Sequence, residues 1–322
     1  MIGRSAAFRR VMEQIESVAP FHASVVLAGE SGTGKEEAAR EIHRRSGREG
    51  RFLGINCAAF PEGIIESQLF GHERGAFTGA QEKHRGFFEQ ADHGTLFLDE
   101  ITETSKGLQA KLLRALEERQ VIPLGGSMPI GFDTRVIAAS NRDLEGAVAE
   151  RALRKDLFYR LNVVQIDLPP LRKRKEDIEL LAEKFIAEFN SPPQIEILGL
   201  DEECRAALRA HSWPGNVREL RNAVQRAMIE RRRGYLKAEN LPATVRRFKR
   251  ESEPMTFNVG MSLAELQREA TIRTFRATCG NHRRAAKILG ISPNTLYKAL
   301  AKYGVEPNRA GSQPDPSSKG FS

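Results

Sequence analysis

The sequence predicts an α/β fold in which a parallel sheet is layered between helices, followed by an all-helical region and a small basic module. Five short aliphatic runs alternate with helical patterns over residues 1–168, which is typical of buried parallel strands in a three-layer α/β/α arrangement. With 322 residues and 40% hydrophobic content, the chain is long enough to bury such a core. The five expected strands are residues 24–28, 52–55, 95–98, 136–139 and 163–166.

The remaining elements follow in chain order. Two apolar stretches, 121–124 and 128–130, flank a Gly-Gly-Ser turn and predict a small hairpin between the third and fourth strands. From 169 to 245 helices replace strands, with Asp201 as the N-cap of one helix and a longer helix over 217–232. The charged stretch 246–262 contains Pro254 and Gly260 and predicts a flexible linker. A compact helical domain is expected over 263–304, and the Ser/Pro/Gly-rich tail 305–322 is expected to be disordered.

The net positive charge is concentrated in the C-terminal part. From Arg246 onward there are fourteen Lys and Arg and six Asp and Glu, which accounts for the whole net charge of +8. This asymmetry favours a module that binds nucleic acid, the alternative being a merely soluble basic tail. No apolar run approaches the roughly 18 residues of a membrane helix and no signal peptide is evident, so a cytoplasmic protein without a membrane partner is expected. Cys57, Cys204 and Cys279 lie far apart and predict neither disulfides nor a zinc site.

A glycine-rich loop that can hold phosphate follows the first expected strand. It reads Gly29-Glu30-Ser31-Gly32-Thr33-Gly34-Lys35 and is followed by a helix. In that context the backbone N–H groups and the helix N-terminus cradle phosphate oxygens, while Lys35 reaches the β and γ phosphates. Glu36 stands where a Ser or Thr hydroxyl usually holds Mg²⁺, a departure from the usual loop. The alternative, a turn that binds nothing, is disfavoured by the acidic residues described next.

Two adjacent carboxylates end the third expected strand, in Thr95-Leu96-Phe97-Leu98-Asp99-Glu100. A buried strand that delivers two acids to its C-terminal edge is costly unless a cation and a substrate use them. Asp99 is expected to hold Mg²⁺ through water, and Glu100 to polarise the water that attacks the γ-phosphate. The sequence therefore predicts an ATP-hydrolysing enzyme with ATP and Mg²⁺ as its cofactors.

Phe77 is an apolar residue between glycines in a polar stretch, which is unsuited to bury it in a helix or strand. Either the ring is presented to a partner, or the stretch is an ordinary surface loop. The string is Gly75-Ala76-Phe77-Thr78-Gly79-Ala80. It resembles the GAFTGA loop of bacterial enhancer-binding proteins, the AAA+ ATPases that remodel RNA polymerase holoenzyme carrying sigma-54, and residues 66–73 are similar to the same pattern. The resemblance implies that these six residues contact sigma-54.

Further roles come from this resemblance, which covers about residues 1–242. Glu36 is common in the family's loop. Asn56 is implied to turn Glu100 toward or away from the water, and Asn141 matches the sensor I position. Arg154 and Arg160 resemble paired arginine fingers that act on a neighbouring subunit. In Trp213-Pro214-Gly215-Asn216-Val217-Arg218, which is similar to the sensor II segment, Asn216 is expected to cap a helix that carries Arg218 to the nucleotide.

The basic module is similar to the Fis-type helix-turn-helix domain. A short helix, the turn at Gly290 and a third helix that starts with Ser292 as N-cap and Pro293 predict this motif. Pro293 and the pair Lys298-Ala299 depart from the family pattern. The expected contacts to double-stranded enhancer DNA are Arg283 and Arg284 to phosphates and Ser292, Asn294, Thr295, Tyr297 and Lys298 near the groove.

Together the resemblances imply a sigma-54-dependent transcriptional activator that forms a ring, as a hexamer when active, at the nucleoid of a bacterium. Two rivals are an AAA+ regulator that acts without sigma-54, which the intact string at 75–80 disfavours, and a non-enzymatic DNA-binding scaffold, which would not need Lys35, Asp99 and Glu100. Many family members carry a receiver or sensor domain before the ATPase. The 28 residues before Gly29 are too few for one, so control in trans or a shortened chain is expected.

Overall fold

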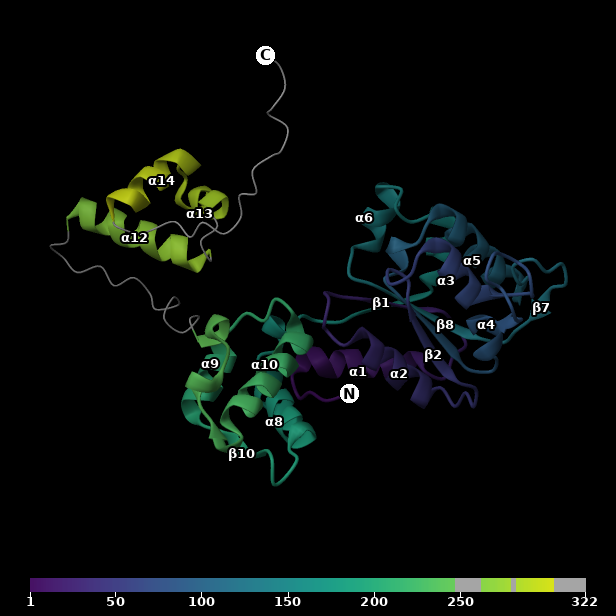
Figure 1. The fold of residues 1–322 in the computed structure, drawn as a ribbon, viewed down its shortest axis with the longest axis horizontal. Coiled ribbons are helices and arrows are strands. Elements are labelled where there is room, and N and C mark those ends of the chain that lie inside the picture. The colour runs from purple at the N-terminus through teal and green to yellow at the C-terminus, as the bar shows by residue number, and fades with distance from the viewer. Residues whose placement is uncertain (247–261, 279–281, 304–322) are drawn as a thin grey trace, which may run out of the picture. The chain divides into compact units, whose positions relative to one another are not determined.

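The computed structural model describes residues 1–246, 262–278 and 282–303, which belong to two units (Figure 1). One unit is Met1–Pro242 and the other begins at Ala243. The first is built on a five-stranded parallel sheet with strand order β2-β5-β8-β1-β9. This confirms the predicted α/β fold, and each strand begins and ends within one residue of its expected bounds. The strands are β1 (Val25–Ala28), β2 (Phe52–Asn56), β5 (Thr95–Asp99), β8 (Arg135–Ser140) and β9 (Val164–Asp167).

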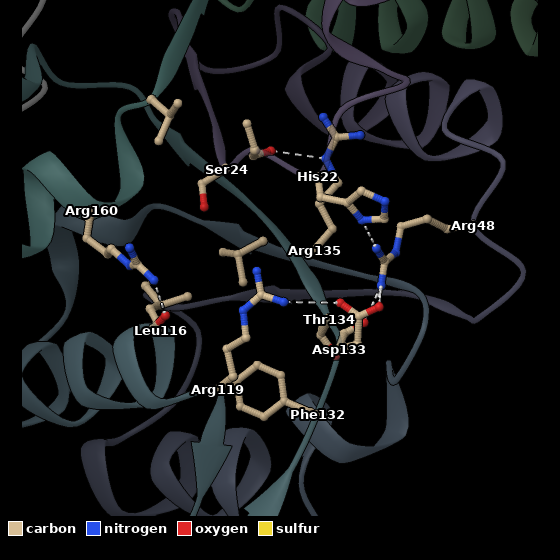
Figure 2. A pocket seen from close by; sticks show the side chains of 13 residues that line it. His22, Ser24, Arg48, Leu116, Arg119, Phe132, Asp133, Thr134, Arg135 and Arg160 are labelled. Atoms are coloured by element: carbon tan, nitrogen blue, oxygen red, sulfur yellow. Dashed lines mark hydrogen bonds and ion pairs between the residues drawn. The ribbon is translucent and has the colours of Figure 1, made fainter.

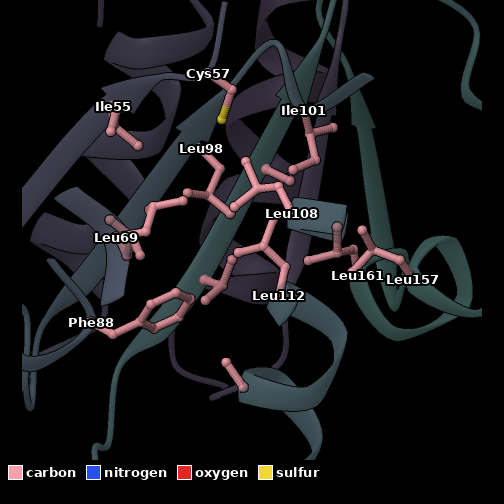
Figure 3. Close-up of a cluster of buried hydrophobic side chains, with 14 of the residues drawn as sticks. Ile55, Cys57, Leu69, Phe88, Leu98, Ile101, Leu108, Leu112, Leu157 and Leu161 are labelled. Atoms are coloured by element: carbon pink, nitrogen blue, oxygen red, sulfur yellow. The ribbon is translucent and has the colours of Figure 1, made fainter. Parts of the chain in front are cut away.

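Helices cover both faces of this sheet because successive strand side chains point to opposite sides. The helices of the two layers and their connections are α1 (Ala6–Val18), α2 (Lys35–Arg45), α3 (Glu62–Phe70), α4 (Phe87–Gln90), η1 (Ile101–Glu103), α5 (Lys106–Glu118), α6 (Leu144–Ala149) and α7 (Lys155–Leu161). In β1, Val25 and Leu27 pack in one buried cluster with α1 and α2, while Val26 packs in the other cluster with α3, α5 and α7. Figure 3 shows the second cluster, in which Leu108 and Leu112 of α5 meet Leu98 of β5.

A buried arginine fastens α1 to the sheet. Arg135, the first residue of β8, is 2% exposed, and its guanidinium donates to the carbonyl oxygens of Val18, Ala19 and Ala23 at 3.0, 2.7 and 3.2 Å. Burial, and after it the positive charge of Arg48, lower the pKa of Arg135 to about 10. The carbonyls at the end of α1, which lack helical partners, are thereby satisfied.

The region after β9 is mainly helical and differs from expectation in one respect. It contains η2 (Leu171–Lys173), α8 (Asp177–Phe189), α9 (Glu202–Ala210), α10 (Asn216–Arg231) and η3 (Ala238–Asn240). Asp201 caps α9 by accepting from the N–H of Cys204 at 2.7 Å, as expected. Between these helices, β10 (Glu196–Leu200) and β11 (Arg233–Leu236) form a two-stranded parallel sheet that the sequence pattern did not predict. Two strands this short, separated by two helices, leave too weak a periodic signal to be recognised.

Two small antiparallel pairs project from the α/β layers. The expected hairpin is present as β6 (Gln120–Val121) and β7 (Ile130–Gly131). A second pair, β3 (Gly71–His72) and β4 (His84–Arg85), closes the base of the loop that carries Phe77. Leu124 of the hairpin joins that base, because its N–H donates to Gly71 and its carbonyl accepts from Glu73, both at 2.9 Å.

The second unit contains three helices, α12 (Leu263–Ala277), α13 (His282–Leu289) and α14 (Pro293–Lys302). They pack around Phe275, Ala285, Leu296 and Leu300. Gly290 lies in the turn with φ +67°, and the side chain of Ser292 caps α14 through the N–H of Thr295 at 3.1 Å. The expected linker falls almost wholly on 247–261 and the expected tail on 305–322, both outside the described residues. None of the helices in the described ranges combines the length and hydropathy that a membrane span requires.

The aromatic core beside β5 generates a stability prediction. Phe88 is fully buried and its ring lies 5.8 Å from that of Phe70 and 4.8 Å from that of Phe132. Phe88→Ala should lower the free energy of unfolding by about 3–5 kcal/mol, because it leaves a cavity and removes both ring contacts. Phe21→Ala, at a ring 64% exposed, is the matched control and should stay within about 0.5 kcal/mol of wild type. Urea denaturation measures both, and equal losses would contradict this account of the core.

Candidate functional site

The phosphate loop connects β1 to α2 and has the backbone that its glycines permit. Gly32 and Gly34 adopt φ of +77° and +102°, a region that favours glycine. A Cβ at Gly32 would lie 2.4 Å from the carbonyl oxygen of Gly215, so only glycine fits there. Lys35 is 7% exposed, and its Nζ donates to the carbonyl of Gly29 at 2.9 Å. The loop therefore presents backbone N–H groups, a helix N-terminus and an ammonium group together, which is the donor set that a polyphosphate needs.

The acidic pair lies at the same edge of the sheet. Asp99 ends β5, and Glu100 follows in a left-handed conformation with φ +54°. The N–H of Asn141, just after β8, points to the Glu100 carboxylate at 3.4 Å. Gly29 donates to the carbonyl of Ser140 at 3.2 Å, which joins the phosphate loop to the end of β8. The carboxyl ends of β1, β5 and β8 thus bring the phosphate loop, Glu100 and Asn141 to one edge.

Asn56 is placed beside this pair but has another partner. It ends β2 in register with Asp99, and its Oδ1 accepts from the N–H of Ala58 at 2.9 Å, as a strand-end cap.

Cys57 follows Asn56 and is buried beside Asp99 and Glu100. Burial, and after it the negative charge of these two carboxylates, raise the pKa of Cys57 to about 12. A thiol with so high a pKa is a packing residue rather than a nucleophile. Cys204 is also buried and free, and Cys279 lies outside the described residues.

The mainly helical region after β9, from η2 to η3, is called the lid below, and it contacts the outside of the phosphate loop through Glu30. Arg172 donates to both carboxylate oxygens of Glu30 at 2.5 and 2.7 Å, and this hydrogen-bonded ion pair holds the pKa of Glu30 at about 2. Asn216, fully buried, donates to the Glu30 carboxylate at 3.2 Å and to the carbonyl of Ser31 at 3.0 Å, and accepts from the N–H of Leu171 at 2.8 Å. The expected capping role of Asn216 is not observed: Gly215 is the N-cap of α10, and Asn216 is its first residue with φ +52°.

Three more contacts complete this attachment. Arg218 donates to the hydroxyl of Ser31 at 3.1 Å. The N–H of Val217 donates to the carbonyl of Gly32 at 2.9 Å, and Arg174 donates to the carbonyl of Thr33 at 2.9 Å. Each residue from 30 to 33 is therefore hydrogen-bonded to the lid. Sequence reasoning expected Arg218 at the nucleotide and placed Arg172 at the join of the two parts without a role, but it missed Arg174, whose only signal was the run of basic residues after the two prolines at 169 and 170.

Of the two predicted finger arginines, Arg154 is the N-cap residue of α7 and Arg160 lies on this helix, and they have different partners. Arg154 is bound bidentately by Asp156 at 2.7 and 3.1 Å. Arg160 donates to the carbonyl of Leu116 at 2.7 Å. In the described part of the chain, neither guanidinium is hydrogen-bonded to the phosphate loop. The buried Gln109 fixes the start of α7, since its Oε1 accepts from the N–H of Arg154 at 2.8 Å.

The loop over 75–80 is a tight turn. Gly75 and Gly79 adopt φ of +83° and +108°, and the N–H of Gly75 donates to Ala80 at 2.8 Å. Phe77 is 46% exposed. Its ring packs edge-to-face with the ring of His72, and the two ring centroids are 5.0 Å apart. His72 is held by the hydroxyl of Ser67 at 2.7 Å. Sequence reasoning missed His72, because nothing in its local pattern shows that the loop folds back onto it.

In the second unit, the predicted DNA contacts lie on α13 and on the start of α14. Arg283, Ser292, Asn294, Thr295, Tyr297 and Lys298 are all exposed. The hydroxyls of Ser292 and Thr295 bond each other at 2.8 Å, and Tyr297 stacks on His282 with ring centroids 4.1 Å apart. Arg284 lies on α13. The backbone arrangement is a helix-turn-helix.

Three families match the chain in succession. The Sigma-54 interaction domain matches residues 1–167, the AAA+ ATPase lid domain residues 172–256, and the Bacterial regulatory protein, Fis family, residues 262–303. "Regulatory protein AtoC" of Escherichia coli K12 is 44% identical over 314 residues, which cover 95% of this chain and 68% of that protein. "Transcriptional regulatory protein FlbD" of Caulobacter vibrioides is 43% identical, over 94% of this chain and 70% of FlbD.

A solved structure is similar over the same extent. NtrX from Brucella abortus in complex with ADP has a TM-score of 0.71 at 34% identity, covering 95% of this chain and 70% of NtrX. These matches confirm the predicted ATPase class and the predicted sigma-54 and DNA partners. The chain therefore belongs to the AAA+ ATPases that activate sigma-54-dependent transcription and carry a Fis-type helix-turn-helix domain.

Proposed function

We propose that the chain hydrolyses MgATP in a homo-oligomeric ring and uses the turnover to press the Phe77 loop against sigma-54 while the helix-turn-helix holds upstream DNA. The observation that carries this proposal is the shared edge of the sheet, where the N–H of Asn141 points to Glu100 and the carbonyl of the preceding Ser140 accepts from Gly29 of the phosphate loop. Glu100 is the residue that would orient the attacking water, and Lys35 the one that would bind the β and γ phosphates.

The acidic residues at this edge of the sheet also fit a magnesium ion bound to the nucleotide. Asp99 would hold it through water, since its carboxylate ends a buried strand at this edge. Glu36 is ion-paired with Arg40 at 2.7 Å and is half exposed, so its role is to start α2 with a negative charge near the helix N-terminus. Mg²⁺ would supply charge neutralisation between the β and γ phosphates.

The arginines at the start of α7 and on it support the proposed ring. Arg154 and Arg160 bond to Asp156 and Leu116 of their own chain, away from their own phosphate loop. A cation that stabilises the transferred phosphoryl group would then come from the adjacent subunit, and a hexamer is the closed ring proposed. During turnover, Asn56 would exchange its hydrogen bond with Ala58 for one with Glu100. Arg218 would likewise exchange its hydrogen bond with Ser31 for one with the nucleotide.

Domain limits are part of the same proposal. Residues 1–168 form the α/β ATPase part, 169–245 the lid, 246–262 a linker, 263–304 the DNA-binding domain and 305–322 a tail. Arg283 and Arg284 would bind phosphates, and Ser292, Asn294, Thr295, Tyr297 and Lys298 would lie at the groove. Their exposure supports this assignment wherever the side chain is described.

Replacement of the loop aromatic tests the sigma-54 contact. Phe77→Ala should keep ATP hydrolysis and DNA binding but abolish capture of sigma-54 in the presence of a transition-state nucleotide analogue, because the 46% of Phe77 that is exposed is apolar surface available to a partner. The free energy of unfolding should fall by only about 1 kcal/mol. Phe60→Ala, at a ring 44% exposed, is the matched control. If Phe77→Ala captured sigma-54 as well as wild type, the proposed sigma-54 contact would be wrong.

Mixing of two inactive variants tests the shared site. Arg160→Ala subunits keep the phosphate loop, and Lys35→Ala subunits keep the arginine. In an equimolar mixture about a quarter of the sites should pair an intact loop with an intact arginine, so phosphate release should recover to about a quarter of the wild-type rate. Each variant alone should be at least about 100-fold slower than wild type. Co-assembly is verified by tagged pull-down, and no recovery despite co-assembly would exclude a shared site.

Acid titration tests the attachment of the lid to the phosphate loop. Glu30 has a pKa of about 2 when folded and 4.5 as its ordinary value, so its ion pair stabilises the fold fully above pH 4.5 and loses this effect as the pH falls toward 2. The difference in unfolding free energy between wild type and Glu30→Gln should be constant from pH 8 to about 5, at roughly 1 kcal/mol or less for a half-exposed pair, and shrink below that. A difference that grows as the pH falls would contradict the assignment.

A further inference from the structure

Gln109, on α5, is a polar side chain inside the apolar layer between the sheet and its helices. It is fully buried, and Leu108 before it belongs to the cluster shown in Figure 3. A buried amide is costly unless its donors and acceptor are satisfied. The Nε2 group of Gln109 donates to the carbonyls of Thr104 and Ala152, at 2.9 and 2.8 Å. Its Oε1 accepts from the N–H of Arg154 at 2.8 Å.

The two sides of this contact differ in how far they depend on Gln109. The N–H and the hydroxyl of Thr104 both donate to the carbonyl of Ile101, at 3.3 and 2.6 Å, so Thr104 is held without Gln109. In the connection from α6 to α7, the N–H groups of residues 150–153 donate to carbonyls of α6. The next N–H, that of Arg154, donates to Gln109 instead. Gln109 therefore ties Arg154 to a segment that is fixed independently.

The side chain of Arg154 has a second, weaker attachment. Its guanidinium pairs with Asp156 at 2.7 Å, and the two side chains are 41% and 45% exposed. An ion pair this exposed contributes little to stability. It is also given up whenever the guanidinium reaches the nucleotide of an adjacent subunit. The buried bond from the backbone of Arg154 to Gln109 can persist through that movement.

The other end of α7 lacks a contact of this kind. Arg160 donates to the carbonyl of Leu116 on α5 at 2.7 Å, as Figure 2 shows. Both residues line a cavity at the amino ends of β1, β8 and β9, together with Arg48, Arg119 and Arg135. Because this contact uses the guanidinium of Arg160 itself, it is lost when that group acts elsewhere. Gln109 is thus the polar contact between α5 and the start of α7 that leaves both guanidinium groups free.

We propose, on the basis of the shared site proposed above, that Gln109 is a positioning residue for the arginine that each subunit supplies to its neighbour. It holds the backbone of Arg154, so that the guanidinium can leave Asp156 without displacement of the start of α7. A displacement of about 1 Å at a catalytic group can lower a rate roughly 100-fold. Thr104, the anchor of Gln109, follows Glu100 by four residues. The contact therefore links the supplied arginine to the segment that follows Glu100 of its own chain.

Mixed rings in which one kind of subunit carries Gln109→Met test this role. The parent mixture combines Lys35→Ala subunits, which supply the arginines, with Arg154→Ala subunits, which supply the intact phosphate loop. Methionine matches glutamine in length but cannot replace its amide hydrogen bonds. In the Lys35→Ala subunits, Gln109→Met should lower the recovered phosphate release about tenfold or more, because the supplied arginine is misplaced. In the Arg154→Ala subunits it should leave the recovered rate within about twofold, because the productive sites use the arginines of the other subunit.

The direction of the effect separates positioning from a general structural role. A purely structural role predicts equal loss in the two mixtures, and that result, or no loss in either, would overturn the proposal. Co-assembly is verified by tagged pull-down in each mixture. If the parent mixture itself does not recover activity, the shared site is wrong and the role of Gln109 is rejected with it. Recovery in the parent with equal loss in both mixtures rejects the role of Gln109 alone.

A second variant and a measurement on the wild type cover the case in which Gln109→Met does not fold. Gln109→Ala leaves a polar cavity with three backbone partners for a water molecule, which preserves the fold but holds Arg154 less firmly. Its loss should be smaller and again confined to the Lys35→Ala subunits. In the wild type, NMR should show the N–H of Arg154 exchanging as slowly as that of Leu153, which donates to Ala147. Fast exchange at Arg154 alone would contradict the proposal.

Discussion

The parallel register of five buried strands is the constraint on which the rest of the molecule depends. Because β1, β5 and β8 run in the same direction, the residues that follow them meet at one edge, and Glu100, Asn141 and the phosphate loop become neighbours although they lie far apart in the chain. The hydrogen bond from Gly29 to Ser140 and that from Leu168 to Ala28 tie the loop and the lid connection to the same strand ends. The opposite edge gathers the residues before these strands, which is how four arginines come to line one cavity.

The lid is attached to the phosphate loop by direct hydrogen bonds. Glu30, Ser31, Gly32 and Thr33 all hydrogen-bond to residues after β9, and Gly32 approaches Gly215 so closely that no side chain fits between them. A change in the loop backbone therefore displaces α10 directly. The same contacts explain why Asn216 begins α10 in a left-handed conformation: its amide is used on the loop, and Gly215 takes the N-cap position.

Local sequence patterns predicted much of this architecture. Aliphatic runs of four or five residues sufficed to locate all five strands of the large sheet, and Asp201, Ser292 and Pro293 marked helix starts through local capping. The loop that carries Phe77 and the nucleotide motifs predicted the family, and the match of the Sigma-54 interaction domain to residues 1–167 confirms it. Contacts between distant segments could not be predicted. Arg172 and Glu30 are 142 positions apart, β10 pairs with β11 across two helices, and Phe77 folds onto His72 through a turn whose shape no short pattern encodes.

The attachment between loop and lid has a consequence for how the protein unfolds. Hydrogen bonds that link Ser31 to Asn216 and Thr33 to Arg174 span 185 and 141 positions, and breaking them leaves polar groups of both parts without partners. Opening of either the sheet or the lid alone would break these bonds, so the stabilities of the two parts are coupled within the compact unit Met1–Pro242. Native-state amide exchange is expected to report this coupling as similar opening free energies for the two parts, whereas an independent lid would exchange at a lower free energy than the sheet.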